Sequence, residues 1–171
     1  MIERYSRKQL KDIWSEENKY KIWLEVEIAA AEAMEKFKII PKGISSIVKK
    51  KGKIKVKRIH DIEAKVKHDV IAFLTSITEQ AGIKARYLHQ GMTSSDVLDT
   101  SFNIQLMQSG KIILKDIDKI LIVLKRQAKK YKMTPCIGRS HGIHAEPITF
   151  GLKLASFYEE FKRNKKRLKD A

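Results

Sequence analysis

The sequence has one cysteine, three prolines and no long run of apolar residues. The single cysteine, Cys136, excludes a disulfide within the chain, and no second cysteine is present to complete a paired-cysteine metal site. No apolar stretch approaches the roughly 20 residues that a helix needs to cross a bilayer. Few prolines and no alternation of apolar and polar residues leave little room for a β-sheet. We therefore expect an all-α protein without a membrane partner.

Two common catalytic signatures are also missing. The sequence contains neither the Gly-x-x-x-x-Gly-Lys-Ser/Thr loop of P-loop enzymes nor the His-Glu-x-x-His pair of zinc proteases. Residues 1–6 lack the apolar segment of a secretory signal. Together with the lone cysteine, this predicts a cytoplasmic protein that uses no metal and no cofactor.

Positive charge is abundant. With 36 Lys and Arg against 20 Asp and Glu, the formal net charge is +16, and residues 49–58 and 162–169 are the densest basic runs. Such a charge is compatible with a nucleic-acid partner. Few aromatic residues lie among the basic ones, however, so stacking platforms for bases are scarce. We favour two solvated lysine-rich segments, the first a loop or a short frayed helix, and expect no nucleic-acid partner.

The spacing of apolar residues predicts helices over most of the chain. Ser6 is expected to cap a short helix, and Ser15 to cap a second one over about residues 16–37. A further helix is expected over about residues 59–80, with Gly82 as its stop. In the second helix the predicted buried stripe consists of Ile22, Val26, Ala29, Ala30, Ala33 and Phe37.

A much longer helix is expected to begin at Thr93–Asp96 and to end near Tyr131, about 50 Å at 1.5 Å per residue. Its apolar stripe consists of Leu98, Phe102, Leu106, Ile113, Ile117, Ile120, Leu124, Ala128 and Tyr131. Because this helix outreaches the rest of the chain, the stripe requires helices from another subunit or from further sequence. A last helix from about Thr149 is still amphipathic at Ala171, which suggests a truncated chain. The expected domains are 1–92 and 93–171.

The strongest local signal for chemistry is the segment Gly138–Pro147, expected as an active-site loop. It places His141 beside Ser140 and between two glycines, and a second histidine, His144, follows. An exposed imidazole beside a fixed hydroxyl suits proton transfer. The alternative is a basic turn with two incidental histidines.

A second signal precedes the long helix. Residues 91–96 combine a glycine, three hydroxyl side chains and an acid at a helix start. Free backbone N–H groups there form a pocket suited to a carboxylate, although a simple N-cap accounts for the same pattern. His68 and His89, taken singly, are equally compatible with structural roles.

Taken in order, five segments resemble the adenylosuccinate lyases of the fumarase/aspartase superfamily. They are Ile2–Ser6, Lys67–Val70, His89–Thr100, Gly138–Pro147 and Thr149–Ala155. The resemblance covers the chain from end to end. It implies an N-terminal helical domain followed by the first long helices of a central helical bundle, in a homotetramer.

The resemblance also implies a reaction. It is the β-elimination of fumarate from adenylosuccinate, which gives AMP, and from succinylaminoimidazole carboxamide ribotide, both steps of purine nucleotide biosynthesis. By analogy His141 is the general acid that protonates the leaving nitrogen. Ser140 stands where the family usually has threonine. The remaining substrate-binding residues implied by the resemblance are Arg4, Tyr5, Lys67, His68, Asp69, His89, Thr93 and Ser94.

One part of the family's machinery is not in these 171 residues. The general base of the family is a serine on a mobile loop with the signature Ser-Ser-x-Met-Pro-x-Lys-x-Asn-Pro, which the sequence does not contain. We therefore expect the 171 residues alone to be inactive. Two alternatives are another lyase of the superfamily, such as argininosuccinate lyase, fumarase or aspartase, and a basic helical nucleic-acid-binding protein.

Overall fold

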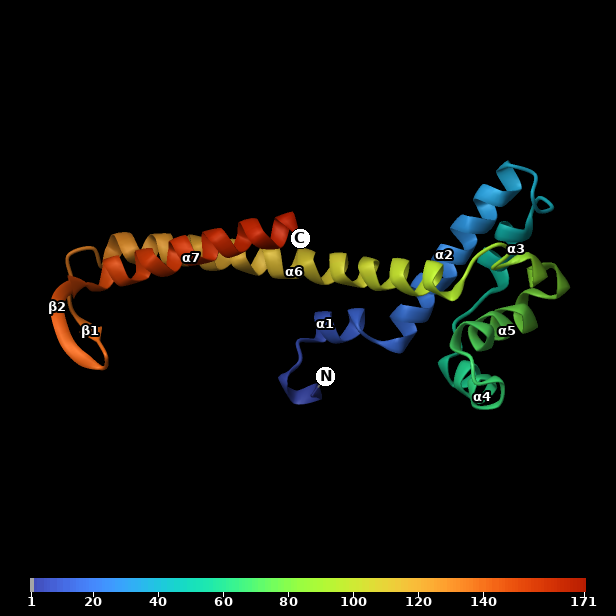
Figure 1. The fold of residues 1–171 in the computed structure, drawn as a ribbon, viewed down its shortest axis with the longest axis horizontal. Helices are drawn as coiled ribbons and strands as arrows, with labels where there is room; N and C mark the ends of the chain where they lie inside the picture. The colour runs from blue at the N-terminus through green and yellow to red at the C-terminus, as the bar shows by residue number, and fades with distance from the viewer. Residues whose placement is uncertain (1) are drawn as a thin grey trace. The chain divides into compact units, whose positions relative to one another are not determined.

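The computed structural model describes residues 2–171 and forms two compact units, Met1–Gln108 and Ser109–Ala171. The helix α6 runs through both (Figure 1). The predicted all-α class is confirmed, apart from one small hairpin. The expected domain boundary after residue 92 falls just before α6 and stays a prediction. The elements of the first unit are a 3-10 turn at Glu3–Tyr5, α1 (Lys8–Ile13), α2 (Glu16–Lys36), α3 (Ile44–Lys51), α4 (Val56–Val66), α5 (Asp69–Ala81), a second 3-10 turn at Ile83–Tyr87 and the start of α6 (Ser94–Lys130).

The start of α2 is capped as predicted, because the Ser15 hydroxyl accepts a hydrogen bond from the Asn18 N–H at 3.2 Å. Ser6 does not cap α1. Its hydroxyl donates to the Ile2 carbonyl at 2.8 Å, and α1 begins after Arg7 with no side-chain cap.

The buried face of α2 differs from the predicted one. Ala29, Ala33 and Phe37 are exposed, Phe37 to 73%. The face that packs inward lies on an adjacent stripe with the same spacing of three and four, and it includes a charged residue. Its members are Tyr20, Trp23, Leu24, Glu27 and Ala31, and Ile22 of the predicted stripe is buried beside them.

The predicted single helix over residues 59–80 is wrong, because the chain breaks between α4 and α5. Lys67 ends α4 in the left-handed conformation, with a φ of 56°, and His68 starts α5 as its N-cap. The predicted stop at Gly82 is confirmed, with a φ of 81°. The basic run 49–58 is shared between the end of α3, a short connection and the start of α4.

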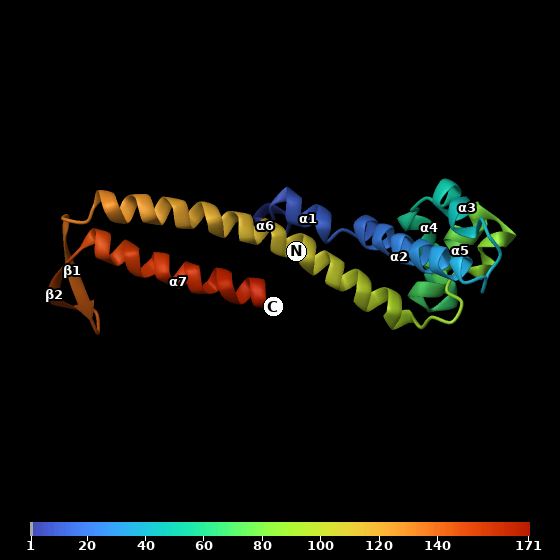
Figure 2. The same cartoon turned by 90° about the horizontal axis from the view of Figure 1, so that it is seen from above.

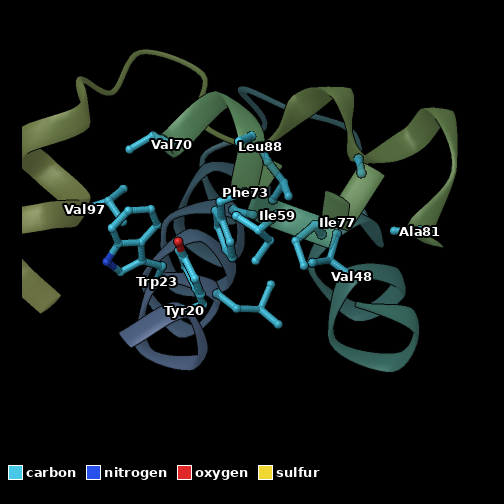
Figure 3. Close-up of a cluster of buried hydrophobic side chains, with 14 of the residues drawn as sticks. Tyr20, Trp23, Val48, Ile59, Val70, Phe73, Ile77, Ala81, Leu88 and Val97 are labelled. Carbon is cyan, nitrogen blue, oxygen red and sulfur yellow. The ribbon is translucent and has the colours of Figure 1, made fainter. Parts of the chain in front are cut away.

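The core of the first unit is built around three aromatic rings (Figure 3). Tyr20, Trp23 and Phe73 lie with ring centroids 5.2 to 6.0 Å apart. Burial of each large apolar side chain contributes about 1.5–3 kcal/mol. The same burial raises the pKa of Tyr20 to about 12. Smaller side chains complete the cluster, among them Ile59 and Ile77.

The predicted long helix is confirmed as α6, which has 37 residues. Its inward face in the first unit is mostly small and polar, with Ser101 and Gln105 buried, and Gln105 donates to the Ile13 carbonyl at 2.8 Å. Much of the apolar stripe remains exposed, including Phe102, Leu106, Ile113 and Ile120. Among the described residues no helix, α6 included, combines the length and apolar character that a membrane span requires.

The second unit contains the rest of α6, the strands β1 (Pro135–Ser140) and β2 (Ile143–Thr149), and α7 (Phe150–Asp170). α7 begins as predicted, with the Thr149 hydroxyl accepting from the Leu152 N–H at 3.1 Å, and returns beside the end of α6 (Figures 1 and 2). The prediction that no sheet forms is wrong here. Residues 141–147 are all exposed, so the strands lack the buried face that would have produced an alternating pattern.

Candidate functional site

The segment 138–147 is a β-hairpin rather than a loop. Ser140 pairs with Ile143, which leaves His141 and Gly142 as a two-residue turn. Their φ angles are 54° and 79°, as a tight hairpin turn with two left-handed residues requires. His141, the predicted general acid, therefore lies exposed at the tip, next to Ser140 at the end of β1.

Gly138 makes the hairpin possible. The strand register shifts between Ile137 and Arg139, and a Cβ atom at Gly138 would lie only 2.6 Å from the Glu146 carbonyl oxygen. Next to this bulge is a shallow pocket whose lining includes the cationic side chains of Arg139 and Lys153.

The sequence of residues 138–142 also matches the Gly-x-Ser-x-Gly motif of the nucleophile elbow in α/β-hydrolases. In that elbow the serine stands on a turn from a strand to a helix. Here Ser140 ends a strand of an antiparallel hairpin, so the geometry does not support a serine hydrolase.

Lys67, His68 and Asp69 lie together at the junction of α4 and α5. His68 Nδ1 accepts a long hydrogen bond of 3.4 Å from the Ile71 N–H and lies 3.5 Å from Asp69 Oδ1. Asp69 Oδ1 also accepts from the Val70 N–H at 2.7 Å. Because the bond from Ile71 engages Nδ1, the Nε2 atom of His68 is the one left to bond other partners.

His89 stands in the turn that leads into α6, with a φ of 60°. Its ring nitrogen Nδ1 lies 2.6 Å from Oε1 of Glu27, and its backbone N–H donates to Oε2 of the same side chain at 2.9 Å. Sequence reasoning missed Glu27. The available signal was its place between Trp23 and Ala31 on the buried face of α2, where a charge is unusual.

The N-terminus of α6 retains free donors. Asp96 Oδ2 accepts from the Thr93 N–H at 2.7 Å, so this acid caps the helix rather than filling the space before it. Within residues 2–171 no hydrogen bond engages the N–H groups of Ser94 and Ser95. They point outward from the positive end of the helix dipole, an arrangement suited to an anionic ligand.

Arg4 and Tyr5 are exposed, Tyr5 to 73%, in the 3-10 turn at the start of the chain. The Arg4 guanidinium lies 4.8 Å from the centroid of the Tyr5 ring, a cation–π contact.

The predicted site residues thus form four local groups. Three belong to the first unit: the pair Arg4 and Tyr5, the junction 67–69, and the turn from His89 to Ser94. The fourth, Ser140 with His141, belongs to the second unit. Among residues 2–171 no cluster of three or more His, Cys, Asp or Glu side chains is arranged to hold a metal ion.

Comparison with known families identifies the class. A family model described as "Lyase" matches residues 3–171. The chain therefore belongs to this lyase family, which confirms the predicted membership of the fumarase/aspartase superfamily.

Among curated proteins the sequence is similar to adenylosuccinate lyases. It is 47% identical to that of Thermotoga maritima, 44% to that of Bacillus subtilis and 46% to that of Streptococcus mutans. Each match covers all of this chain and 40% of the relative, so the chain spans about two fifths of the length of these enzymes.

Solved structures with other activities share the fold. The chain resembles a fumarate lyase from Mesorhizobium sp. BNC1 with a TM-score of 0.88 and 27% identity, over 94% of this chain and 39% of that one. It resembles a 3-carboxy-cis,cis-muconate lactonizing enzyme from Pseudomonas putida with a TM-score of 0.89 and 25% identity, over 97% of this chain and 40% of that one. The predicted start of a fumarase/aspartase-like helical bundle is thereby confirmed.

Proposed function

We propose that the whole protein to which this chain belongs is an adenylosuccinate lyase. The observation that carries the proposal is the identity of 44–47% to three enzymes of that name over all 171 residues. The fold alone does not decide between substrates, because the fumarate lyase and the muconate lactonizing enzyme share it at 25–27% identity.

The reaction is an elimination across a carbon–carbon bond of the succinyl group. A base removes a proton from the carbon next to one carboxylate, the electron pair forms the double bond of fumarate, and the carbon–nitrogen bond breaks. The leaving nitrogen takes the electrons of that bond and needs a proton. His141 supplies it. Its exposed position at a two-residue turn lets the ring enter a site completed by other parts of the protein.

The other groups bind the substrate, which is a polyanion. The free N–H groups at the start of α6, with the hydroxyls of Thr93 and Ser94, are suited to a carboxylate of the succinyl group. Arg4 is suited to the phosphate, since a guanidinium pairs well with phosphate oxygens. Lys67, His68 and Asp69 form a further wall of the site, and Ser140 positions substrate beside His141.

The same proposal extends to the rest of the protein. The catalytic base, a serine on a mobile loop, belongs to a part of the protein other than these 171 residues. The exposed apolar stripe of α6 supports assembly as a homotetramer, because partner helices would cover Ile113 and Ile120. The lone Cys136 fits the reducing cytoplasm, where we place the protein.

His141 is tested in the whole protein by measuring fumarate release from adenylosuccinate. His141→Gln should lower kcat by about 10²–10⁴, the usual contribution of a general acid. His144→Gln is the matched control, since His144 is an exposed histidine of the same hairpin, and it should retain kcat within about tenfold of wild type. Equal losses in both variants, or an unchanged kcat in His141→Gln, would remove His141 from this role.

A further inference from the structure

A buried carboxylate holds His89, which the family resemblance assigns to substrate binding, at two points. Glu27 of α2 is only 1% exposed, and both of its oxygens bond to His89, one to the ring and one to the backbone. We propose that Glu27 is a positioning residue, which fixes His89 so that Nε2 of its ring accepts a hydrogen bond from a hydroxyl or N–H group of the nucleotide. This inference rests on the proposed function.

The chemistry of the pair determines which nitrogen is free. In this proposal Glu27 is ionised. An ionised carboxylate only accepts hydrogen bonds, so the proton of the 2.6 Å contact then lies on Nδ1 of His89. In the neutral ring Nε2 then carries the lone pair. Within residues 2–171 Nε2 has no hydrogen-bond partner and is not fully shielded from solvent, and the His89 side chain is 16% exposed.

The second oxygen of Glu27 fixes the backbone. His89 adopts a φ of 60°, which residues other than glycine rarely do, and its N–H donates to Glu27 Oε2 at 2.9 Å. The His89 carbonyl in turn accepts from the Met92 N–H at 3.3 Å. Glu27 therefore holds both the ring and the turn that leads to Thr93 and Ser94.

A purely structural role explains the pair poorly. Burying a carboxylate carries a large solvation penalty, and apolar residues of similar volume are often at least as stabilising as a buried charged group with its partner. The neighbours of Glu27 on the same helix face, Trp23, Leu24 and Ala31, are apolar. The two hydrogen bonds that Glu27 makes to His89 account for a carboxylate at this apolar position.

The first test determines the protonation of the His89 ring directly in the whole protein. Nitrogen NMR of ¹⁵N-histidine-labelled protein at alkaline pH should show Nδ1 of His89 protonated and Nε2 unprotonated. Glu27→Gln offers one acceptor oxygen instead of two, and its NH₂ group donates. The His89 backbone N–H can only donate, so it should keep its bond to the remaining oxygen. The NH₂ group of the glutamine then faces the ring and donates to Nδ1, and the ring proton should move to Nε2.

Glu16→Gln is the matched control, because Glu16 contacts His60 at 3.0 Å in an exposed pair outside the site. It should leave the His89 signals unchanged. A wild-type ring protonated on Nε2, or a Glu27→Gln spectrum identical to wild type, would overturn the proposal whether or not the protein is an adenylosuccinate lyase.

The second test asks whether Glu27 acts through His89. In the whole protein Glu27→Gln should raise the KM for adenylosuccinate about tenfold, the worth of one hydrogen bond, with a smaller change in kcat. The double variant Glu27→Gln/His89→Gln should then have the KM of His89→Gln alone. Independent effects that multiply in the double variant would overturn the proposal.

The two tests separate the two ideas. If the wild-type protein releases no fumarate from adenylosuccinate, the proposed function fails, and the NMR result still decides whether Glu27 sets the state of the His89 ring. If wild type is active and the KM of Glu27→Gln equals that of wild type, the positioning role fails and the proposed function stands.

Discussion

At the scale of single residues, Glu35 shows how one side chain stabilises a helix other than its own. It belongs to α2, and its Oε1 accepts from the Ser45 N–H at 2.7 Å, in the first turn of α3. The N-cap position of α3 is Gly43, which has no side chain to do this. The hydrogen bond from the Ser45 N–H lowers the pKa of Glu35 below its ordinary value.

This shift predicts a dependence of stability on pH. Because the pKa of Glu35 is lower in the folded state, its stabilisation is complete above the ordinary carboxyl pKa and is lost as the pH falls through the lowered value. Glu35→Gln should therefore reduce the free energy of unfolding by about 1 kcal/mol near neutral pH, and by less in acid. Urea unfolding at both pH values measures the difference. Glu32→Gln, an exposed carboxylate of the same helix, should have little effect at either pH, and an equal loss from both variants would contradict the capping role.

Candidate site residues could be proposed from the sequence where their pattern is rare. The combination of glycines, Ser140 and His141 marks residues 138–147 as a candidate site without any structure, and the role of these residues stays a prediction. Glu27 was not readable, because a glutamate in a helix is nearly always solvated, and only the packing of α2 shows that this one is inside. Similarly, no sequence signal predicted the left-handed Lys67, since lysine rarely adopts a positive φ.

At the scale of elements, the turn of the β-hairpin sets the position of His141. Its turn needs a positive φ at both central residues, and Gly142 supplies one of them at 79°. Gly142→Val should strain the turn, displace His141 and lower kcat for fumarate release by about tenfold or more, because small misplacements are costly in catalysis. Gly142→Asn should keep most of the activity, since asparagine tolerates the left-handed conformation.

Circular dichroism of both variants separates this effect from unfolding. Helix content should match wild type in each, because the hairpin contributes nothing to the helices. Full activity in Gly142→Val would show that the turn geometry is not needed to place His141.

The positions of the long helices were predicted from the sequence more accurately than the helix faces that are buried. The spacing of apolar residues located α6 and α7 to within a few residues, because long amphipathic helices carry a repeated signal. The inward face of α2 was assigned one stripe away, because alanines on two stripes make both look apolar. The hairpin was missed because its strands have no buried face.

At the scale of the whole molecule, the chain carries more apolar helix surface than its own residues cover. On α6 alone, Phe102, Met107, Ile113 and Ile122 are each more than two fifths exposed. The chain also spans about two fifths of the length of the adenylosuccinate lyases that it matches. Both observations agree with a site that is completed by other parts of the protein and by partner subunits, as proposed above.

The most direct test of this account is a comparison of fumarate release from adenylosuccinate and from argininosuccinate. We predict that the whole protein releases fumarate and AMP in equal amounts from adenylosuccinate and no fumarate from argininosuccinate. The 171-residue chain alone should release none from either, because the proposed catalytic base lies outside these residues. Release from argininosuccinate but not from adenylosuccinate would contradict the proposed function, and turnover by the isolated chain would contradict the division of the site.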